Sequence, residues 1–327
     1  MKKIVFLLLT CLLAVMSMGK PAAAYPAYAQ MAYETPREAT GKIVCANCHL
    51  NQLPTQVEIP QSVTPGQVFD VVVKIPYDHS KLQVTGDGSK GGLNVGSVVV
   101  LPEGFRLASE EEMTEAQREE VAETYVAAYS DEKPNILVVG PISGDEHPEI
   151  VFPIKAPDPA EDPSVAFMKY YVYVGANRGR GQINPNGSLS NNNLFRSPVT
   201  GTVEEILVLA DPATDLPPEW VDKVDIGDGY PDTRLITFST EKGLAAMVIP
   251  PGPELVVAVG DSVKEGSPLT NNPNVGGFGQ ADREIVLQSP DRVKWLIAFL
   301  AAVFVAQVML VLKKKQVELI QAAEVLG

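Results

Sequence analysis

The sequence predicts a mainly β protein with two strand-rich domains and one membrane-spanning helix. Short apolar runs separated by Pro and Gly recur between residues 57 and 287, and such runs are typical of strands joined by tight turns. In the soluble part, the segment around residues 109–125 spaces its apolar side chains as a helix does. Near the C-terminus, residues 295–312 contain one clearly polar side chain, Gln307. As a helix this run would span ~27 Å, which is enough to cross a bilayer.

The N-terminal residues have the features of a secretory signal peptide. Two lysines precede an apolar run at residues 4–15, and small residues follow as far as Ala24. This pattern predicts that residues 1–24 are removed and that Tyr25 becomes the amino terminus. An uncleaved anchor is the alternative, but the run is shorter than the roughly 20 apolar residues that a bilayer needs.

The strands of the first domain are expected on both sides of the soluble helix. We predict that helix in ASEEEMTEAQREEVAETYVAAY, with a capping box between Ser109 and Glu112. The strands are predicted in QVFDVVVKIPYD, GGLNVGSVVVLPEGF, PNILVVGPI, EIVFPI and FMKYYVYVG. Because Pro and Gly interrupt these runs, the first domain is interpreted as a sandwich of short strands with many turns.

A polar stretch, NRGRGQINPNGSLSNNN, marks the junction between the two domains. Beyond it, SPVTGTVEEILVL and PPGPELVVAVGDSVKEGSPLT resemble the two halves of lipoyl or biotinyl carrier domains. A carrier needs a lysine in a tight hairpin flanked by methionines, and Lys242 in STEKGLAAM does not match that pattern. The second domain is therefore expected to be a small barrel sandwich without a swinging arm.

The charge balance limits the classes of partner. Acidic residues outnumber Lys and Arg by 40 to 26, which gives a formal net charge of −14. Such a surface repels nucleic acid and anionic lipid headgroups. It suits a basic or neutral protein partner, although solubility alone explains it equally well. The lysines at 313–315 directly follow the apolar run, so the positive-inside rule predicts that the C-terminal tail faces the cytoplasm or its organellar equivalent.

The segment IVCANCHL carries two thiols and an imidazole, from Cys45, Cys48 and His49. In a C-x-x-C-H pattern, two thiols on one turn can each add across a vinyl group of one porphyrin, and the adjacent imidazole then faces the iron. The remaining cysteine, Cys11, lies in the expected leader, so no structural disulfide framework is possible. The pattern therefore favours one covalently bound haem c.

Two other interpretations of this segment are open. Zinc would need two further ligands, and His79 and His147 are not at ligand spacing from a cysteine or from each other. A redox-active dithiol normally follows a strand in a βαβ unit, whereas TPREATGKIVCANCHLNQLPTQ shows Pro and polar residues instead. Export also favours haem, because haem c is attached outside the cytoplasm.

The residues by themselves do not identify a sixth ligand for the iron. None of the candidates is in a diagnostic setting, and the two histidines are expected to be solvated loop residues. The candidates are His79, His147, Met31, Met113, Met168 and Met247.

Long segments rich in Gly, Pro and Asn, spread along nearly all of the mature chain, resemble the cytochrome f family, which supplies the haem subunit of the cytochrome bf complex of oxygenic photosynthesis. They are YP at the expected terminus, ETPREATGKIVCANCHL, VVKIPYD, GGLNVGSVVVLPEGF, KAPDP, YVGANRGRGQINPNGS, NPNVGGFGQADREIVLQ and KKKQ. The resemblance implies an elongated sandwich domain that holds haem c, a small lipoyl-like barrel sandwich and one C-terminal membrane helix.

The resemblance also implies the iron ligands. In this family the free α-amino group of the mature N-terminal Tyr, here Tyr25, binds the iron opposite His49. An α-amine titrates near 8, so it can bind iron in its neutral form at modest cost. Pro26 and Tyr28 would pack against the haem, and Pro26 would stiffen the terminus.

The family further holds a buried chain of water molecules, bound by amide side chains. Amides suit this task because each one both donates and accepts hydrogen bonds. Without the resemblance these residues would be interpreted as loop and turn residues. The matching positions are Asn177, Gln182, Asn192, Asn272 and Asn274.

The resemblance implies an electron-transfer subunit of a plastoquinol–plastocyanin oxidoreductase complex and not an enzyme by itself. It would take single electrons from the Rieske iron–sulfur protein, beside the cytochrome b subunits, and pass them to plastocyanin or a small soluble c-type cytochrome. Plant members carry a basic ridge for an acidic acceptor, whereas only Lys81 and Lys90 lie near those positions here. We therefore expect a cyanobacterial-type protein with a less acidic acceptor.

The predicted organisation combines these findings. Residues 1–24 are the leader, residues 25–192 and 272–293 the large haem-binding domain, and residues 193–271 the small domain. Residues 294–312 cross a thylakoid membrane once, with the large domain in the lumen, and residues 313–327 form the tail on the cytoplasmic side. The small domain is longer than in plant members around LADPATDLPPEWVDKVDIGDGYPD, a length for which the sequence offers no functional account.

Two other classes of function are weighed against electron transfer. A haem enzyme would need an open iron position and a distal acid or base, so rapid binding of cyanide or carbon monoxide would favour it. A carrier or structural barrel protein would contain no haem, and modification of Lys242 would support it.

Overall fold

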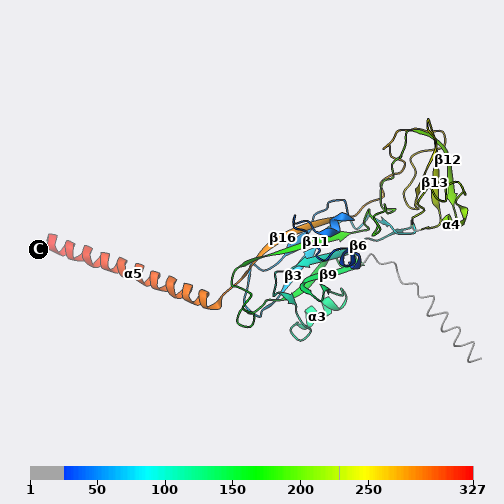
Figure 1. Ribbon diagram of the computed structural model, residues 1–327. Coiled ribbons are helices and arrows are strands. Elements are labelled where there is room, and N and C mark those ends of the chain that lie inside the picture. Colours follow the sequence, from blue (N-terminus) through cyan, green and yellow to red (C-terminus); the bar gives the residue numbers. More distant parts are fainter. Residues whose placement is uncertain (1–25, 228, 327) are drawn as a thin grey trace, which may run out of the picture.

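The computed structural model describes residues 26–227 and 229–326. The expected leader, its cleavage after Ala24, and Tyr25 lie outside the described residues. Figure 1 shows an elongated molecule with a central β-rich body, a second sheet at one end and the long helix α5 projecting from the other end. The predicted mainly β fold with one C-terminal membrane-type helix is confirmed.

The elements are short except for the last helix. The helices are α2 (Ala27–Ala32), the 3-10 helix η1 (Val44–Asn47), α3 (Glu115–Ala122), α4 (Pro212–Asp215) and α5 (Pro290–Leu326). The strands are β1 (Gln56–Glu58), β2 (Ser62–Val63), β3 (Val68–Lys74), β4 (Gln83–Val84), β5 (Lys90–Gly91), β6 (Asn94–Val100), β7 (Arg106–Leu107), β8 (Ala127–Ser130), β9 (Lys133–Ser143), β10 (Glu149–Lys155), β11 (Lys169–Arg178), β12 (Gly201–Leu209), β13 (Thr233–Thr240), β14 (Gly243–Ile249), β15 (Ser262–Val263) and β16 (Gly277–Leu287).

Two sheets form the central body. One has the strand order β1-β3-β10-β7 and the other the order β2-β16-β11-β6-β9-β8. In β3 every second residue is buried, as expected of a strand with one face on a core. Val71 and Phe152 from the first sheet pack in one cluster with Val99 and Val174 from the second. The two sheets therefore enclose a shared core, as in a β-sandwich.

The strand that precedes the membrane helix returns to this body from the second sheet unit. β16 pairs antiparallel with β11 over ten positions, from Lys169↔Val286 to Arg178↔Gly277. The chain therefore leaves the body after β11, builds β12 to β15, and comes back through β16 (Figure 1). Only Gln288 and Ser289 separate the end of β16 from α5.

The second unit is a four-stranded sheet with the order β14-β13-β12-β15. Its main core contains Phe195, Ile236 and Phe238. The segment between β12 and β13 contains the short helix α4 and Trp220, which is 8% exposed. Trp220 packs with Leu209 and Leu235 in a separate cluster, so this segment covers the other face of the β12–β13 pair.

The soluble helix is shorter than the sequence predicts, and its predicted start was wrong. The backbone amide of Ser109 does donate to Glu112 Oε2 at 2.9 Å, but residues 109–113 form turns. The helix begins after Thr114, whose own capping box with Gln117 is complete. Glu112 is held instead by Arg106, at 2.8 Å, and by Lys155, at 3.3 Å, on the neighbouring strands. These ion pairs fix the turn against the sheet, and the second box starts the helix.

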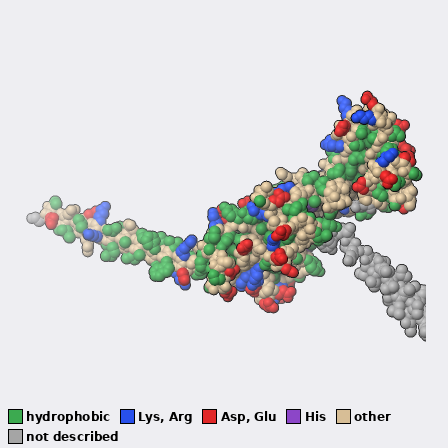
Figure 2. Space-filling model, in the orientation of Figure 1, with side chains coloured by type: hydrophobic (Ala, Val, Ile, Leu, Met, Phe, Trp, Pro, Cys, Tyr) green, Lys and Arg blue, Asp and Glu red, His purple; other side chains and the backbone are tan. Residues whose placement is uncertain are grey.

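Helix α5 is long and apolar enough to cross a membrane, and none of its apolar window is buried. Figure 2 shows charged side chains where α5 leaves the body, then a hydrophobic stretch, and charged side chains again toward the C-terminal end. The lysines at 313–315 lie within the same continuous helix.

The Glu112→Gln variant should lose less stability than the unchanged protein when the pH is lowered into the acid range. The ion pair with Arg106, the Ser109 amide and Lys155 hold the pKa of Glu112 well below its usual 4.5. A carboxyl whose folded-state pKa is depressed adds stability above about pH 4.5 and loses it as the pH falls toward the folded-state value. The variant should unfold about 1–2 kcal/mol more easily at pH 7, and this difference should shrink below pH 4.5.

Denaturant titrations of the full chain at pH 7 and pH 3 measure this difference. Glu111→Gln is the matched control, because Glu111 accepts a hydrogen bond from the Ser109 hydroxyl and forms no ion pair among the described residues. An equal loss of stability at both pH values would contradict the assigned role of Glu112.

Candidate haem site

Cys45, Cys48 and His49 lie on one tight turn. The amides of Cys48 and His49 both donate to the carbonyl of Cys45, at 3.2 and 3.0 Å. Both cysteines are free thiols. Residues 45–49, which begin in η1 and continue just past its end, therefore carry the two sulfurs and the imidazole within a single turn of backbone, which is the arrangement that the C-x-x-C-H pattern predicts.

The turn is fixed on one face of the six-stranded sheet by apolar contacts. Ile43 packs with Phe278 and Val98, and Cys45 packs against the same cluster. Gly175 permits this close approach, because a Cβ there would lie 2.9 Å from Ile43 Cδ1 and 2.8 Å from Phe278 Cζ. A side chain at position 175 would push the turn away from the sheet.

A second segment holds the turn from the other side. The amide of Gln182 donates to the Cys48 carbonyl at 2.7 Å, and Gln182 Oε1 accepts from the Leu50 amide at 2.8 Å. A Cβ at Gly181 would lie 3.1 Å from the Cys48 carbonyl oxygen. The segment after β11 therefore forms hydrogen bonds with both ends of the stretch from Cys48 to Leu50.

Burial sets the protonation of the three candidate groups. It raises the pKa of Cys45 to about 11 and also raises the pKa of Cys48. Burial, with a further contribution from the positive charge of Arg178, lowers the pKa of His49 to about 4. The imidazole is therefore neutral at physiological pH, which is the form that binds a metal ion.

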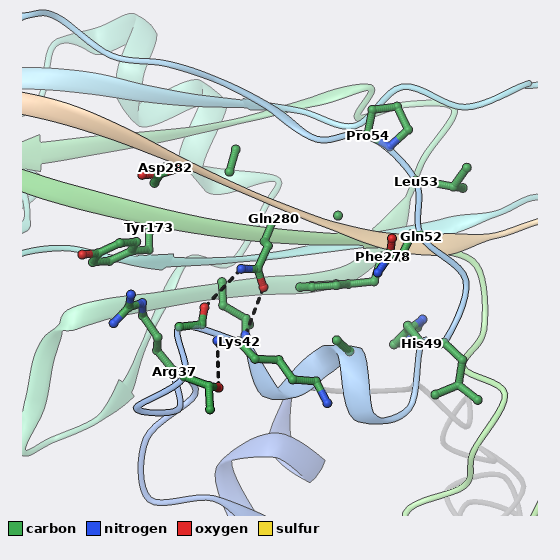
Figure 3. Close-up of a pocket in the computed structure, with 17 residues that line it drawn as sticks. Arg37, Lys42, His49, Gln52, Leu53, Pro54, Tyr173, Phe278, Gln280 and Asp282 are labelled. Carbon is green, nitrogen blue, oxygen red and sulfur yellow. Dashed lines mark hydrogen bonds between the residues drawn. The ribbon is translucent and has the colours of Figure 1, made fainter.

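His49 borders a large cavity. The cavity has a volume of about 1160 Å³ and is lined by His49 and Phe278 at one end and by Arg37 and Tyr173 at the other (Figure 3). The Arg37 guanidinium lies 3.7 Å from the centre of the Tyr173 ring. Gln280 closes one wall by donating to the Gly41 carbonyl and accepting from the Ile43 amide, both at 3.1 Å. Neither cysteine is among the lining residues.

The donor set fits a covalently bound haem. Two thiols and a neutral imidazole lie on one turn, and the buried His49 Nδ1 has no hydrogen-bond partner within the described structure. In the part of the chain that the structure describes, no group of three or more His, Cys, Asp or Glu side chains is placed to hold a metal ion.

Helix α2 begins two residues after the expected N-terminal residue and is hydrogen-bonded to the sheet near the turn. The Tyr129 hydroxyl lies 2.7 Å from the carbonyl oxygens of both Ala29 and Tyr33, and Gln30 Nε2 donates to the Tyr129 carbonyl at 2.7 Å. Ala29 packs against the same apolar cluster as Cys45. Tyr28 is 49% exposed, and Pro26 is half-buried at the N-cap of α2.

Four of the five predicted amide residues form one connected group beside the turn. Asn192 Nδ2 donates to Asn274 Oδ1 at 3.1 Å and to the Arg180 carbonyl at 2.8 Å, and Gln182 Nε2 donates to the same carbonyl at 3.3 Å. Asn272 is exposed and joins the group through the Asn274 amide, at 3.1 Å. Asn177 lies on β11, opposite Gly96 and Phe278, and within the described residues no hydrogen bond links its side chain to the group.

The remaining candidates lie outside this group. His79 is an exposed residue whose ring stacks against Tyr77, with its Nδ1 2.9 Å from Asp145 Oδ1. Lys81 and Lys90 are exposed in the loop and hairpin of β4 and β5. Met31 and Met168 are 83% and 52% exposed, whereas Met113 is buried.

Sequence reasoning missed two residues that the structure brings to the site. Arg178 is fully buried and close enough to His49 to affect its pKa, and Tyr129 holds α2. Each of these residues acts through a hydrogen bond to a residue about 100 positions or more away in the sequence, so no local sequence pattern indicates that it belongs to the site.

Comparison with known proteins gives a consistent family. The model for apocytochrome F, N-terminal, matches residues 25–179, and the model for apocytochrome F, C-terminal, matches residues 191–326. Cytochrome f of Synechococcus sp. (strain JA-3-3Ab) is 68% identical over 100% of both chains. Cytochrome f of Synechococcus sp. (strain JA-2-3B'a(2-13)) is 69% identical over 98% of each, and that of Synechococcus elongatus is 53% identical over 93% of this chain and 91% of its own.

Tyr129→Phe should loosen helix α2. The change removes the hydroxyl that serves the Ala29 and Tyr33 carbonyls and keeps the buried ring, so we expect a loss of about 1–2 kcal/mol. Amide hydrogen exchange should quicken in residues 27–33 and stay unchanged in β11. The control is Tyr171→Phe, which alters an exposed ring on β11. Unchanged exchange in α2 would show that Tyr129 does not hold it.

Proposed function

The chain belongs to the cytochrome f family, and from this membership we propose that it is a membrane-anchored haem c protein that carries single electrons from the Rieske iron–sulfur protein to a soluble acceptor in the lumen. The observation that carries the proposal is the turn at residues 45–49, where two free thiols accompany an imidazole whose pKa is lowered to about 4. Family membership supports the role of a c-type cytochrome in the cytochrome bf complex.

Cys45 and Cys48 would hold the haem through two thioether bonds, and His49 would bind its iron through the neutral imidazole. The bound haem would supply reversible one-electron exchange at its iron. A single haem accounts for all three groups of the turn.

The α-amino group of Tyr25 would be the second ligand of the iron, in addition to the imidazole of His49. Tyr25 immediately precedes Pro26, and Tyr129 anchors α2 close to the cluster that contains Cys45. Pro26 fixes the backbone that presents the amine, and the half-exposed ring of Tyr28 is free to cover the haem. Removal of the leader after Ala24 would then create the ligand itself.

The connected Asn and Gln side chains beside the turn would hold a chain of buried water molecules next to the haem. Asn192 is 1% exposed, and its Oδ1 has no partner among the described residues, as is also true of His49 Nδ1. Buried polar atoms without a protein partner are the usual hosts of internal water. Gln182, Asn192 and Asn274 form its framework, while Asn177 and Asn272 would bind waters at its two ends.

The protein would work within the cytochrome bf complex of a thylakoid membrane, beside the cytochrome b subunits. The large domain would lie in the lumen and residues 313–327 on the cytoplasmic side. Residues 25–192 with 272–293 would form the haem-binding domain and residues 193–271 the small one. Lys81 and Lys90 are both exposed and would contribute to docking of plastocyanin or a small soluble cytochrome.

Mass spectrometry of the protein purified from its membrane tests the terminus and the haem together. We expect a polypeptide that begins at Tyr25 and carries one haem on a peptide containing Cys45 and Cys48. Its absorption spectrum should be that of a low-spin, six-coordinate iron that binds cyanide and carbon monoxide slowly. His49→Gln should abolish this spectrum, whereas the control His147→Gln should preserve it. A different terminus, a chain without haem or a five-coordinate iron would overturn the proposal.

Asn192→Leu should disrupt the water chain without removing the haem. The change deletes the bonds to Asn274 and to the Arg180 carbonyl, so we expect a loss of about 1–3 kcal/mol and fewer ordered waters in a crystal structure. Asn186→Leu, at an exposed turn position, is the control and should keep the waters. An Asn192→Leu structure with the same waters would contradict the assignment.

A further inference from the structure

Arg178 is the largest side chain that the structure buries completely. It is the last residue of β11, opposite Gly277 of β16 and Val95 of β6, and its exposed fraction is 0%. Its Nη2 donates to the Pro54 carbonyl. Its Nε and Nη1 are buried without a hydrogen-bond partner, and no carboxylate of the described residues forms an ion pair with it.

A guanidinium in this position is costly for the fold. Removing an ion from water without a counter-ion is among the most unfavourable events in folding, and well-packed apolar residues commonly replace buried charges at no loss. Burial lowers the pKa of Arg178 only to about 10, so the group stays charged at physiological pH. Packing alone therefore does not account for an arginine here.

The charge lies against the segment that follows His49, and it is close enough to affect the imidazole. Pro54, which accepts from Arg178, ends the segment that begins at His49, and both residues line the same cavity (Figure 3). Asn51 of this segment is fastened to the strand beside Arg178, because its Nδ2 donates to the Gly276 carbonyl at 2.7 Å. A Cβ on Gly276 would lie 2.2 Å from the Arg178 carbonyl oxygen, which shows how closely the two backbones pass.

We propose that Arg178 acts as a fixed buried charge that raises the reduction potential of the haem iron bound by His49, and so sets which donors and acceptors the protein can serve. This inference rests on the proposed function. When the iron accepts one electron from its donor, the positive charge of the centre falls by one. A nearby cation therefore destabilises the oxidised state more than the reduced state.

Burial gives this charge an effect that surface charges lack. Ions in solution screen exposed charges within about 8–10 Å at ordinary salt, but they screen buried charges much less. The contribution of Arg178 should therefore persist at high salt. Arg37 offers a comparison, since it lines the cavity that His49 borders but is only half-buried, and its guanidinium lies 3.7 Å from the centre of the Tyr173 ring.

Redox titration of the full haem-loaded chain in detergent, at low and high salt, tests the proposal. Arg178→Gln and Arg178→Met remove the charge, and each should shift the ferrous–ferric equilibrium toward the oxidised state by about tenfold, or about 59 mV for a one-electron couple. The shift should be the same at both salt concentrations. Arg37→Gln should give a smaller shift that shrinks as salt increases.

Arg178→Lys separates charge from hydrogen bonding and is informative even if the neutral variants fail to fold. A buried lysine loses its proton far more readily than arginine. The Lys variant should keep the potential of the unchanged protein at low pH and fall below it as the pH rises, whereas a purely structural role would give no such difference.

A neutral variant with the native low-spin spectrum and an unchanged potential would overturn the proposal. So would a Lys variant whose potential falls equally at every pH, because that result would assign the effect to the bond with Pro54. Failure of the proposed function is distinguishable, since it would appear in the unchanged protein as missing haem or a five-coordinate spectrum.

Discussion

The ten-residue pairing of β11 with β16 is the constraint on which the rest of the molecule depends. It closes the large sheet after the chain has built the second unit, and it places Phe278 and Gly277 under the segment that follows His49. The Leu53 amide donates to the Phe278 carbonyl, and the Phe278 amide donates to the Asn51 carbonyl. The turn at residues 45–49, the connected amide side chains and helix α5 are therefore all positioned by this one pair of strands.

Glycines make this arrangement possible where backbones pass each other closely. A Cβ at Gly279 would lie 2.1 Å from the Leu53 carbonyl oxygen, and one at Gly175 would strike both Ile43 and Phe278. The segments YVGANRGRGQ and NVGGFGQADR thus combine a strand pattern with positions where no side chain fits. Their function is to bring a turn from early in the chain onto strands from its middle and end.

Local patterns in the sequence were sufficient for much of this structure, and long-range contacts account for what they missed. Alternating apolar residues predicted strands such as β3, and the apolar run before Lys313 predicted the membrane helix. The predicted helix start at Ser109 was wrong because Arg106, on the strand just before the turn, and Lys155, much further along the chain, hold Glu112 in a turn. In the sequence, Arg178 is one of several polar residues in a Gly-rich stretch, and its burial becomes visible only in the folded structure.

The two-residue connection between β16 and α5 has a mechanical consequence. The Gln288 amide donates to the Val63 carbonyl at 2.8 Å, and Ser289 Oγ accepts from the Arg292 amide at 3.2 Å, so both linking residues are themselves fastened. The connection between the sheet and α5 is therefore short and hydrogen-bonded, and it holds the two elements in a fixed relative position. With α5 inserted in a bilayer, the distance from the membrane to the turn at residues 45–49 would be set by the fold itself.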